Sequence, residues 1–317
     1  MNFLIRKGFD WDSARLGRPR EVPIEVLLDR GIVLLDKEDG PTSHDVAATV
    51  KRMFEGTVVF KVGHGGTLDP AATGILPLLL NKAALVQDVI LSSRKEYVGI
   101  MHLHGDVPEA NVESMVKTFT GPIFQRPPDR SAVARVVRIR QIEQIDILEQ
   151  VGRDVLLRVA CEAGTYVRKL CVDIGEAIGC GAHLTELRRT RSGCFSESQG
   201  LVTLGEIGLA VAAWLDDGDE TSLRRIVHPV ERVFDCHPAI VVGARGSGGP
   251  LPRAIDTGTV IAASDSIENG TEVAVFDENG FILARATAAM PAAALIEAPG
   301  TVAAKIIKLY AGIGNLV

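Results

Sequence analysis

The chain has 317 residues, 46% of them hydrophobic, and a formal net charge of −6 at pH 7. This length suits one large domain or two of ordinary size, and the apolar fraction excludes a largely disordered chain. No apolar run reaches the ~18–20 residues that a membrane-spanning helix needs, and the charged N-terminal stretch is unlike a secretion signal, so we expect a soluble cytoplasmic protein.

The first two thirds of the chain alternate between strand and helix patterns. Residues 1–30 are polar and mixed in charge, and we expect them to form an N-terminal extension. Ile32–Leu35 predicts a strand, and Thr42–Asp45 is typical of a helix start, because Thr42 can cap the helix with Asp45 three residues later. Further along, the patterns predict a glycine-rich loop, a strand at Tyr97–His104, a helix near Val112–Phe119, a proline-fixed loop at Gln125–Ser131, strands at Val136–Ile142 and Val155–Cys161, and helices at Tyr166–Ile178 and within Leu204–Leu215.

The composition shifts near Val233–Pro238 towards Gly, Ala and Val. Two β-prone runs, Thr271–Phe276 and Phe281–Ala286, flank an Asp-Glu-Asn-Gly sequence, which is a hairpin signal. We therefore expect a mixed α+β domain over residues 31–235 and a small, mainly β domain over residues 236–317.

The cysteines and histidines give little sign of a disulfide framework or a metal centre. The five cysteines are odd in number and no two are spaced as C-x-x-C, so we expect reduced cysteines that act as small apolar residues. His102 and His104 share a strand face, but no third ligand stands at a suitable spacing in the sequence. No metal site is expected.

Basic residues gather in one part of this acidic chain. Residues 121–198 hold twelve Arg or Lys against ten Asp or Glu, and eleven of the twelve are arginine. Arginine suits planar, bidentate contact with phosphate or carboxylate. A solvated charged surface is the plainer interpretation of most of them.

The most unusual segment is Gly63–Pro70, with the sequence GHGGTLDP. Its three glycines allow backbone turns closed to other residues and leave room for a flat ligand, and Pro70 biases Asp69 towards an extended conformation. The loop lacks the G-K-[ST] ending of a phosphate-binding loop. On its own it is best interpreted as a plain turn with a capping aspartate.

A second segment, Glu162–Arg168, follows an apolar strand and opens a helix. Thr165 is expected to be its N-cap, which places Arg168 in the first turn, where a cation opposes the helix dipole at a cost of ~0.3–1 kcal/mol. That position makes sense if an anion lies opposite Arg168. The alternative is a surface arginine paired with Glu162.

A third segment places Tyr97 near the start of a strand. The ring could stack on a base, and the hydroxyl could donate or accept a proton. Taken alone, such a residue is more often a core tyrosine whose hydroxyl reaches the rim.

Together these segments resemble the TruB family of RNA pseudouridine synthases, and more narrowly its archaeal and eukaryotic dyskerin-type branch, the catalytic subunit of H/ACA ribonucleoproteins. The resemblance runs from about Gly31 to Val230. It rests on six blocks in order, which are GIVLLDKEDGPTSHDV, VGHGGTLDPAATGILP, KEYVGIMHLHGD, RPPDRSAVARVVRIR, CEAGTYVRKLCVDIG and GAHLTELRRTRSG.

The resemblance implies a pseudouridine synthase fold and an isomerisation of RNA uridine that needs no cofactor. By position it makes Asp69 the nucleophile, Tyr97 the residue that stacks on the target base and takes part in proton transfer, and Arg168 the partner of Asp69. It also implies a wider set of substrate- or RNA-binding residues: His64, Gly66, Thr67, Lys95, Leu187, Arg126 and Arg189.

The implied partners are an H/ACA guide RNA, ribosomal RNA as substrate, tRNA position 55 as a further substrate, and the small accessory proteins of that particle. The C-terminal region resembles a PUA domain, although it carries five Arg or Lys against seven Asp or Glu from residue 237 onward. The lysine-rich tail of eukaryotic members is missing, which favours an archaeal-type protein. The alternatives are a stand-alone tRNA T-loop enzyme, a non-catalytic RNA scaffold and, third, a phosphate-loop hydrolase.

Overall fold

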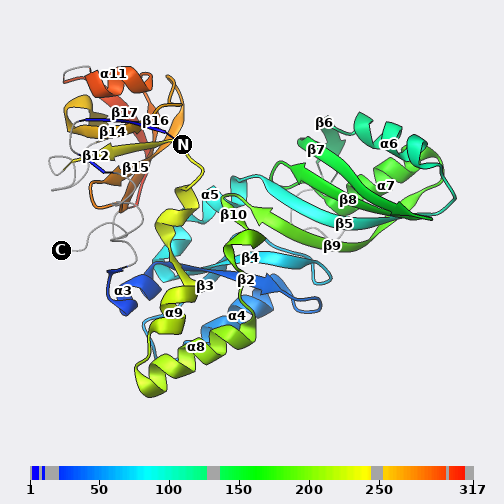
Figure 1. Ribbon diagram of the computed structural model, residues 1–317, viewed down its shortest axis with the longest axis horizontal. Coiled ribbons are helices and arrows are strands. Elements are labelled where there is room, and N and C mark those ends of the chain that lie inside the picture. The colour runs from blue at the N-terminus through cyan, green and yellow to red at the C-terminus, as the bar shows by residue number, and fades with distance from the viewer. Residues whose placement is uncertain are drawn as a thin grey trace.

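The computed structural model describes residues 2–6, 9–10, 21–126, 136–243, 253–297 and 300–310. Two sheets of strands dominate it, and helices flank the larger one (Figure 1). The expected α+β class is confirmed, and the strand pairings of both sheets are largely antiparallel. Within these ranges no helix combines the length and apolar character required to cross a membrane.

Ten of the described strands form the first sheet. All its pairings are antiparallel except that of β4 with β9, which is parallel and joins the two halves of the sheet at its centre. The main path runs β11 (Val227–Pro229), β2 (Gly31–Lys37), β4 (Thr73–Leu80), β9 (Ala182–Ser192), β5 (Lys95–Leu103), β8 (Asp154–Cys161), β7 (Arg138–Val151) and β6 (Gly121–Gln125), while β3 (Val62–His64) pairs with β4 and β10 (Phe195–Ser196) with β9.

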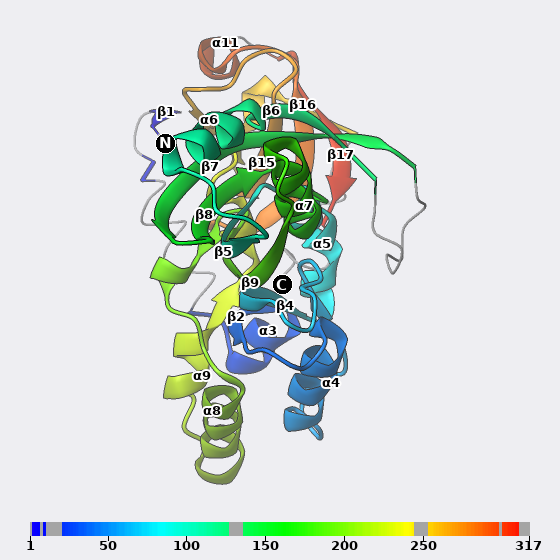
Figure 2. The ribbon, with the colours of Figure 1, turned by 90° about the vertical axis from the view of Figure 1, so that its right-hand side faces the viewer.

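Helices bury one apolar cluster at each end of this sheet. At the first end, α3 (Ile24–Asp29), α4 (Ser43–Met53), α8 (Leu204–Asp217) and α9 (Thr221–Ile226) pack with β2 and β4. At the other end, α6 (Glu109–Thr118) and α7 (Val167–Ile178) pack with β5 and β8, and both views show this pair at the end of the sheet away from α4 (Figures 1 and 2). The remaining short helices of this part are η1 (Asn81–Val86), α5 (Gln87–Ser92), η2 (Glu197–Gln199) and η3 (Val230–Phe234).

Helix starts follow the local sequence where a capping residue is present. Thr42 accepts a hydrogen bond from the backbone of Asp45, and the Asp45 carboxylate accepts one from the backbone of Thr42, as expected. The prediction for α7 was wrong in one respect. The helix has Tyr166 at its N-cap without a side-chain cap, because the Thr165 hydroxyl donates to the Glu162 carbonyl (2.8 Å) instead.

Seven of the described strands form the second sheet. Its path is β1 (Phe3–Ile5), β14 (Val260–Ser264), β12 (Ala239–Val242), β15 (Glu272–Asp277), β16 (Ile282–Ala288), β17 (Val302–Leu309) and β13 (Ala254–Asp256), with η4 (Thr257–Thr259) and α11 (Ala292–Glu297) beside it. The expected hairpin is present as β15 and β16. The N-terminal extension is divided between the two bodies, since β1 pairs with β14 and α3 packs under the first sheet.

One apolar cluster joins the two sheets. It combines Ile32 and Leu79 of the first sheet with Val241, Phe276 and Ile282 of the second, all fully or almost fully buried. The chain enters the second sheet just beyond this contact, through the segment between η3 and β12.

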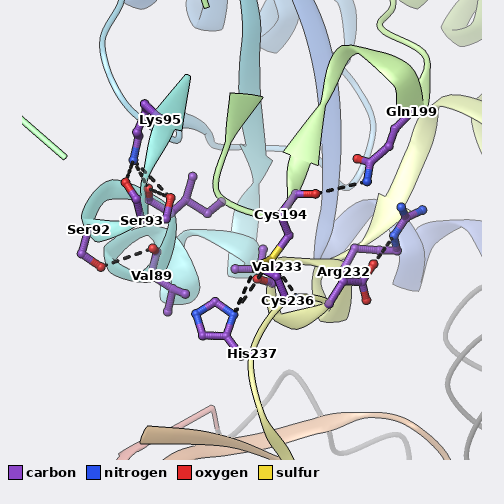
Figure 3. The surroundings of a disulfide bond; sticks show 12 residues. Val89, Ser92, Ser93, Lys95, Cys194, Gln199, Arg232, Val233, Cys236 and His237 are labelled. Atoms are coloured by element: carbon purple, nitrogen blue, oxygen red, sulfur yellow. Dashed lines mark hydrogen bonds and ion pairs between the residues drawn. A yellow bond between two sulfur atoms is a disulfide. The ribbon is translucent and has the colours of Figure 1, made fainter. Parts of the chain in front are cut away.

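A disulfide bond fastens this junction, and the expectation of reduced cysteines throughout was wrong. Cys194, in the turn between β9 and β10, is bonded to Cys236, 42 residues later and directly before His237 (Figure 3). Cys161, Cys171 and Cys180 are free thiols, the first two of them buried. The pairing was missed because the two cysteines meet only through the tertiary fold.

Several other strands begin or end at residues other than those predicted. The strand expected at Val136–Ile142 is the long β7, and Gln125 ends the unpredicted strand β6 rather than opening a loop. Residues 127–131 of the expected proline-fixed loop lie outside the described residues.

Candidate active site

The parallel contact between β4 and β9 places the candidate residues. Gly74 is paired with Arg189, and a Cβ on Gly74 would lie only 2.3 Å from the carbonyl oxygen of Arg189. Gly74 has a φ of +96°, which only glycine adopts without strain. This close approach brings the loop before β4, which carries Asp69, next to the strands β9 and β5.

Asp69 and Arg168 are in direct contact although they are 99 residues apart. The Arg168 guanidinium donates to the Asp69 carboxylate, and the two side chains are 55% and 57% exposed. Glu162, the other expected partner of Arg168, pairs instead with Arg140 (3.3 Å). The anion opposite Arg168 is therefore Asp69, and both groups face solvent.

Helix α7 is held so that Arg168 points at the loop. The buried Gln125 side chain accepts a hydrogen bond from the Tyr166 backbone N–H (2.9 Å) and donates to its carbonyl (3.1 Å). This pair of bonds joins the end of β6 to the start of α7. Arg126, the next residue, is exposed beside them.

Two residues that the sequence analysis missed hold the Asp69 loop from behind. The fully buried Lys37 ammonium donates to the carbonyls of Pro70 and Ala72, both at 2.8 Å. The buried Ser43 hydroxyl donates to the Leu68 carbonyl (3.1 Å) and accepts from the Leu68 N–H (2.9 Å). Their only signal in the sequence was a lysine ending an apolar strand and a serine next to a cap.

Arg189 supports the same loop from the sheet side. Its side chain is almost fully buried, with the residue 1% exposed, and it donates to the carbonyls of Ile75 (2.9 Å) and Gly66 (3.0 Å). Gly66 has a φ of +122°, so the loop turns there in a conformation that favours glycine.

Tyr97 lies between the loop and the sheet. It is half-buried on β5, directly across from Arg189 on β9, and two residues further along Gly99 faces Leu187. Burial raises the pKa of the Tyr97 hydroxyl, the positive charge of Arg189 opposes that rise, and the negative charge of Asp69 adds to it. Tyr97 therefore lies within electrostatic range of the Asp69–Arg168 pair.

The remaining sequence-predicted residues occupy different positions around these three residues. Thr67 is exposed on the loop, and Leu187 is half-buried beside Tyr97. His64 is half-buried, and burial followed by the charge of Arg189 lowers its pKa. Lys95 is turned away, because its ammonium caps the end of α5 by donating to the carbonyls of Ile90 (2.5 Å), Leu91 (3.1 Å) and Ser93 (2.6 Å).

One group of possible metal ligands lies together among the described residues. Cys194, Cys236 and His237 place their ligand atoms within 4.8 Å of one another, but the two sulfurs are bonded to each other. Further off, His102 is hydrogen-bonded to Asp154 (2.7 Å) and His104 to His183 (2.9 Å). Neither group adjoins Asp69.

The sequence matches three known protein domains. Residues 51–167 match the N-terminal domain of the TruB family pseudouridylate synthases, and residues 168–235 match the C-terminal domain of tRNA pseudouridylate synthase B. Residues 258–310 match the PUA domain.

Whole proteins resemble the chain over most of its length. A probable tRNA pseudouridine synthase B of Methanosarcina barkeri is 42% identical over 98% of this chain and 92% of its own. One of Methanopyrus kandleri, described in the same words, is 49% identical over 83% of this chain and 77% of its own.

Solved structures share the fold over both sheets. A chain in the crystal structure of a Cbf5–Nop10–Gar1 complex has a TM-score of 0.83 at 38% identity, covering 98% of this chain and 94% of that one. A chain of an H/ACA RNP bound to a substrate RNA containing 2′-deoxyuridine has a TM-score of 0.84 at 36% identity, with the same coverage.

Proposed function

Because the chain belongs to the TruB family of pseudouridine synthases, isomerases that convert uridine to pseudouridine in RNA, we propose that Asp69 is its catalytic nucleophile. One observation carries this proposal. Asp69 is a solvent-facing carboxylate that Arg168 contacts directly, and its charge acts on the Tyr97 hydroxyl. A nucleophile needs such an exposed position and a group that orients it.

The chemistry follows from these three side chains. In the isomerisation, the N1–C1′ bond breaks, the uracil rotates and a C5–C1′ bond forms, after which C5 loses a proton and N1 gains one, so that the composition of the nucleoside is unchanged. The Asp69 carboxylate attacks the sugar or the base ring and leaves again when the new bond forms. Arg168 aims the carboxylate, and Tyr97 stacks on the base and takes part in the proton transfer from C5.

The target uridine must leave its helix before it can react. Extrusion of a base costs a few kcal/mol, and stacking on an aromatic ring offsets part of this cost. We assign Tyr97 and Leu187 to the face that meets the base, and His64, Gly66 and Thr67 to the loop that meets the nucleotide. The exposed Arg126 is assigned to the RNA backbone. Arg189 supports the site from beneath, whereas Lys95 supports the end of α5.

We propose that the protein acts in the cytoplasm on ribosomal RNA, directed by an H/ACA guide RNA and assisted by small accessory proteins. The support is the 98% coverage of this chain by Cbf5 and H/ACA RNP structures. We assign residues 31–235 to catalysis and residues 236–317 to a PUA-type domain that grips RNA, with β1 of the N-terminal extension completing the second sheet.

A second candidate function is guide-independent modification of tRNA at position 55. It is favoured by the relatives described as probable tRNA pseudouridine synthase B. Pseudouridine formation is to be measured in ribosomal RNA and in tRNA, each with and without guide RNA and accessory proteins. Modification of tRNA by the chain alone supports the second function, and modification of ribosomal RNA only with a guide supports the first.

The nucleophile is tested with Asp69→Asn, which is expected to abolish pseudouridine formation while RNA affinity stays close to that of the original protein. Asp39→Asn removes a neighbouring exposed carboxylate and serves as the control. Arg168→Ala is expected to reduce turnover severely by leaving Asp69 misdirected. Normal turnover by Asp69→Asn would show that this carboxylate is not part of the mechanism. Normal turnover by Arg168→Ala would show that its pairing with Asp69 is not needed for catalysis.

A further inference from the structure

Arg189 occupies an unusual place for a charged residue. It lies on β9 at the centre of the first sheet and is among the largest fully buried side chains of the described chain. The sequence predicted a contact with RNA here, but the guanidinium is enclosed by protein. Arg188, its neighbour, is half-buried and forms ion pairs with Asp36 (3.0 Å) and Glu197 (2.5 Å).

The contacts of Arg189 join three separate elements. Its Nε donates to the Ile75 carbonyl on β4, and one terminal nitrogen donates to the Gly66 carbonyl on the loop that leads to Asp69. On the third side it is paired across the strands with Tyr97 on β5, close enough for its charge to act on the Tyr97 hydroxyl. Only a planar, forked cation can reach such divergent acceptors at once.

A purely structural role explains this arrangement poorly. Moving a cation into the interior costs several kcal/mol, and an apolar side chain of similar volume often fills the same space with equal or greater stability. Each hydrogen bond from a charged donor returns only about 1.5–3 kcal/mol. The acceptors, by contrast, belong to the loop of the proposed nucleophile and to the proposed stacking residue.

We propose that Arg189 is a positioning residue, which fixes the Asp69 loop relative to the Tyr97 ring so that nucleophile and base platform are held at one spacing. This proposal rests on the proposed function of Asp69 and Tyr97. Arg189 is enclosed by protein, with the residue 1% exposed, so we expect it not to touch the substrate. It therefore affects turnover more than RNA affinity.

The charge of Arg189 also acts on the Tyr97 hydroxyl. Burial raises the pKa of Tyr97, and the positive charge of Arg189 lowers it. Removal of the guanidinium should leave the effect of burial unopposed, so that Tyr97 loses its proton at a higher pH. This gives a signal that a simple packing role would not produce.

The test compares Arg189→Met, Arg189→Lys and the matched control Arg188→Met in the full chain. For each we measure the single-turnover rate of pseudouridine formation, the RNA affinity, the melting temperature and the tyrosinate absorbance as a function of pH. A Tyr97→Phe variant identifies which part of the absorbance change comes from Tyr97. Arg189→Met is expected to lower the rate about 100-fold, as a misplacement of about 1 Å can, with RNA affinity nearly unchanged. Arg189→Lys should recover about tenfold of this loss, because the charge returns without the fork.

The control Arg188→Met should keep its rate within about threefold, since it loses only partly exposed ion pairs. A folded Arg189→Met with a normal rate and an unshifted Tyr97 titration would overturn the proposal, as would an equal loss of RNA affinity. If Arg189→Met does not fold, the decision falls to Arg189→Lys, whose full activity would overturn it. A failure of the proposed function is distinct, because Asp69→Asn would then remain active.

Discussion

The loop that carries Asp69 and the junction between the two sheets are stabilised by different means. The loop is held by polar groups, with Lys37, Ser43 and Arg189 bonded to its backbone from the buried side. The junction is held by an apolar cluster and one disulfide. A loop whose reactive face must remain in solvent cannot be buried, so it is fixed by directed hydrogen bonds. A junction needs only adhesion, and non-directional apolar packing provides it.

The largest expected effect is that of Lys37→Met, which removes one of the polar groups that hold the Asp69 loop. The substitution keeps the buried volume but leaves the Ala72 carbonyl without its donor, at about 1–3 kcal/mol for an unsatisfied group, while the Pro70 carbonyl keeps only the Gly40 N–H. Because these residues follow Asp69 directly, the single-turnover rate should fall about 100-fold while RNA affinity changes little.

Lys51→Met, on the exposed face of α4, is the control and should change neither rate nor stability. Denaturant unfolding and single-turnover kinetics measured together separate the two effects. A Lys37→Met protein that is destabilised yet fully active would show that the Lys37 hydrogen bonds do not fix the loop for catalysis.

The junction is tested by replacing both disulfide cysteines with alanine. Closure of a 42-residue span is expected to contribute about 4 kcal/mol through the unfolded state, so the double variant should unfold at a lower denaturant concentration. Turnover at low temperature should be unchanged, because the bond holds the junction and not the loop.

Thiol counting gives an independent check of this bond. Alkylation of the denatured protein should modify three cysteines without a reductant and all five after reduction. Five modified cysteines in both conditions would show that the bond does not form in the isolated protein. If the double cysteine-to-alanine variant lost as much turnover as Lys37→Met, the loop and the junction would not differ in the way proposed.

The same contrast explains what could be predicted from the sequence. Local signals were sufficient for the Thr42 cap, the β15–β16 hairpin and helix α7, because each depends on neighbouring residues. The meeting of Asp69 with Arg168 followed from the motifs and is confirmed as a contact. The parallel pairing of β4 with β9 joins segments more than a hundred residues apart, and no local pattern encodes it.

The groups beneath the site were missed for the same reason. Lys37 and Ser43 become loop supports only when β2 and α4 lie behind residues 68–72. Arg189 was expected to face RNA, since an arginine in a basic region gives no sign of which side of a strand will be covered. The disulfide also depends on distant segments, and an odd number of cysteines was a poor guide to it.

The smallest expected effect concerns Lys95, a buried cation that supports a helix end rather than the loop. Burial, followed by the charge of Arg189, lowers its pKa to about 7, whereas the ordinary value is 10.5. Between these pH values the unfolded chain holds a proton that the folded chain has released, so the stability of the fold should rise with pH across this window. The hydrogen bonds to three carbonyls oppose full deprotonation, so we expect a rise of only about 1 kcal/mol.

Lys95→Met cannot titrate, and the difference in unfolding free energy between the original protein and this variant should therefore increase from pH 7 to pH 10. Comparing the two proteins cancels the titration of all other groups. Parallel stability curves would show that the carbonyls of Ile90, Leu91 and Ser93 keep the ammonium charged throughout.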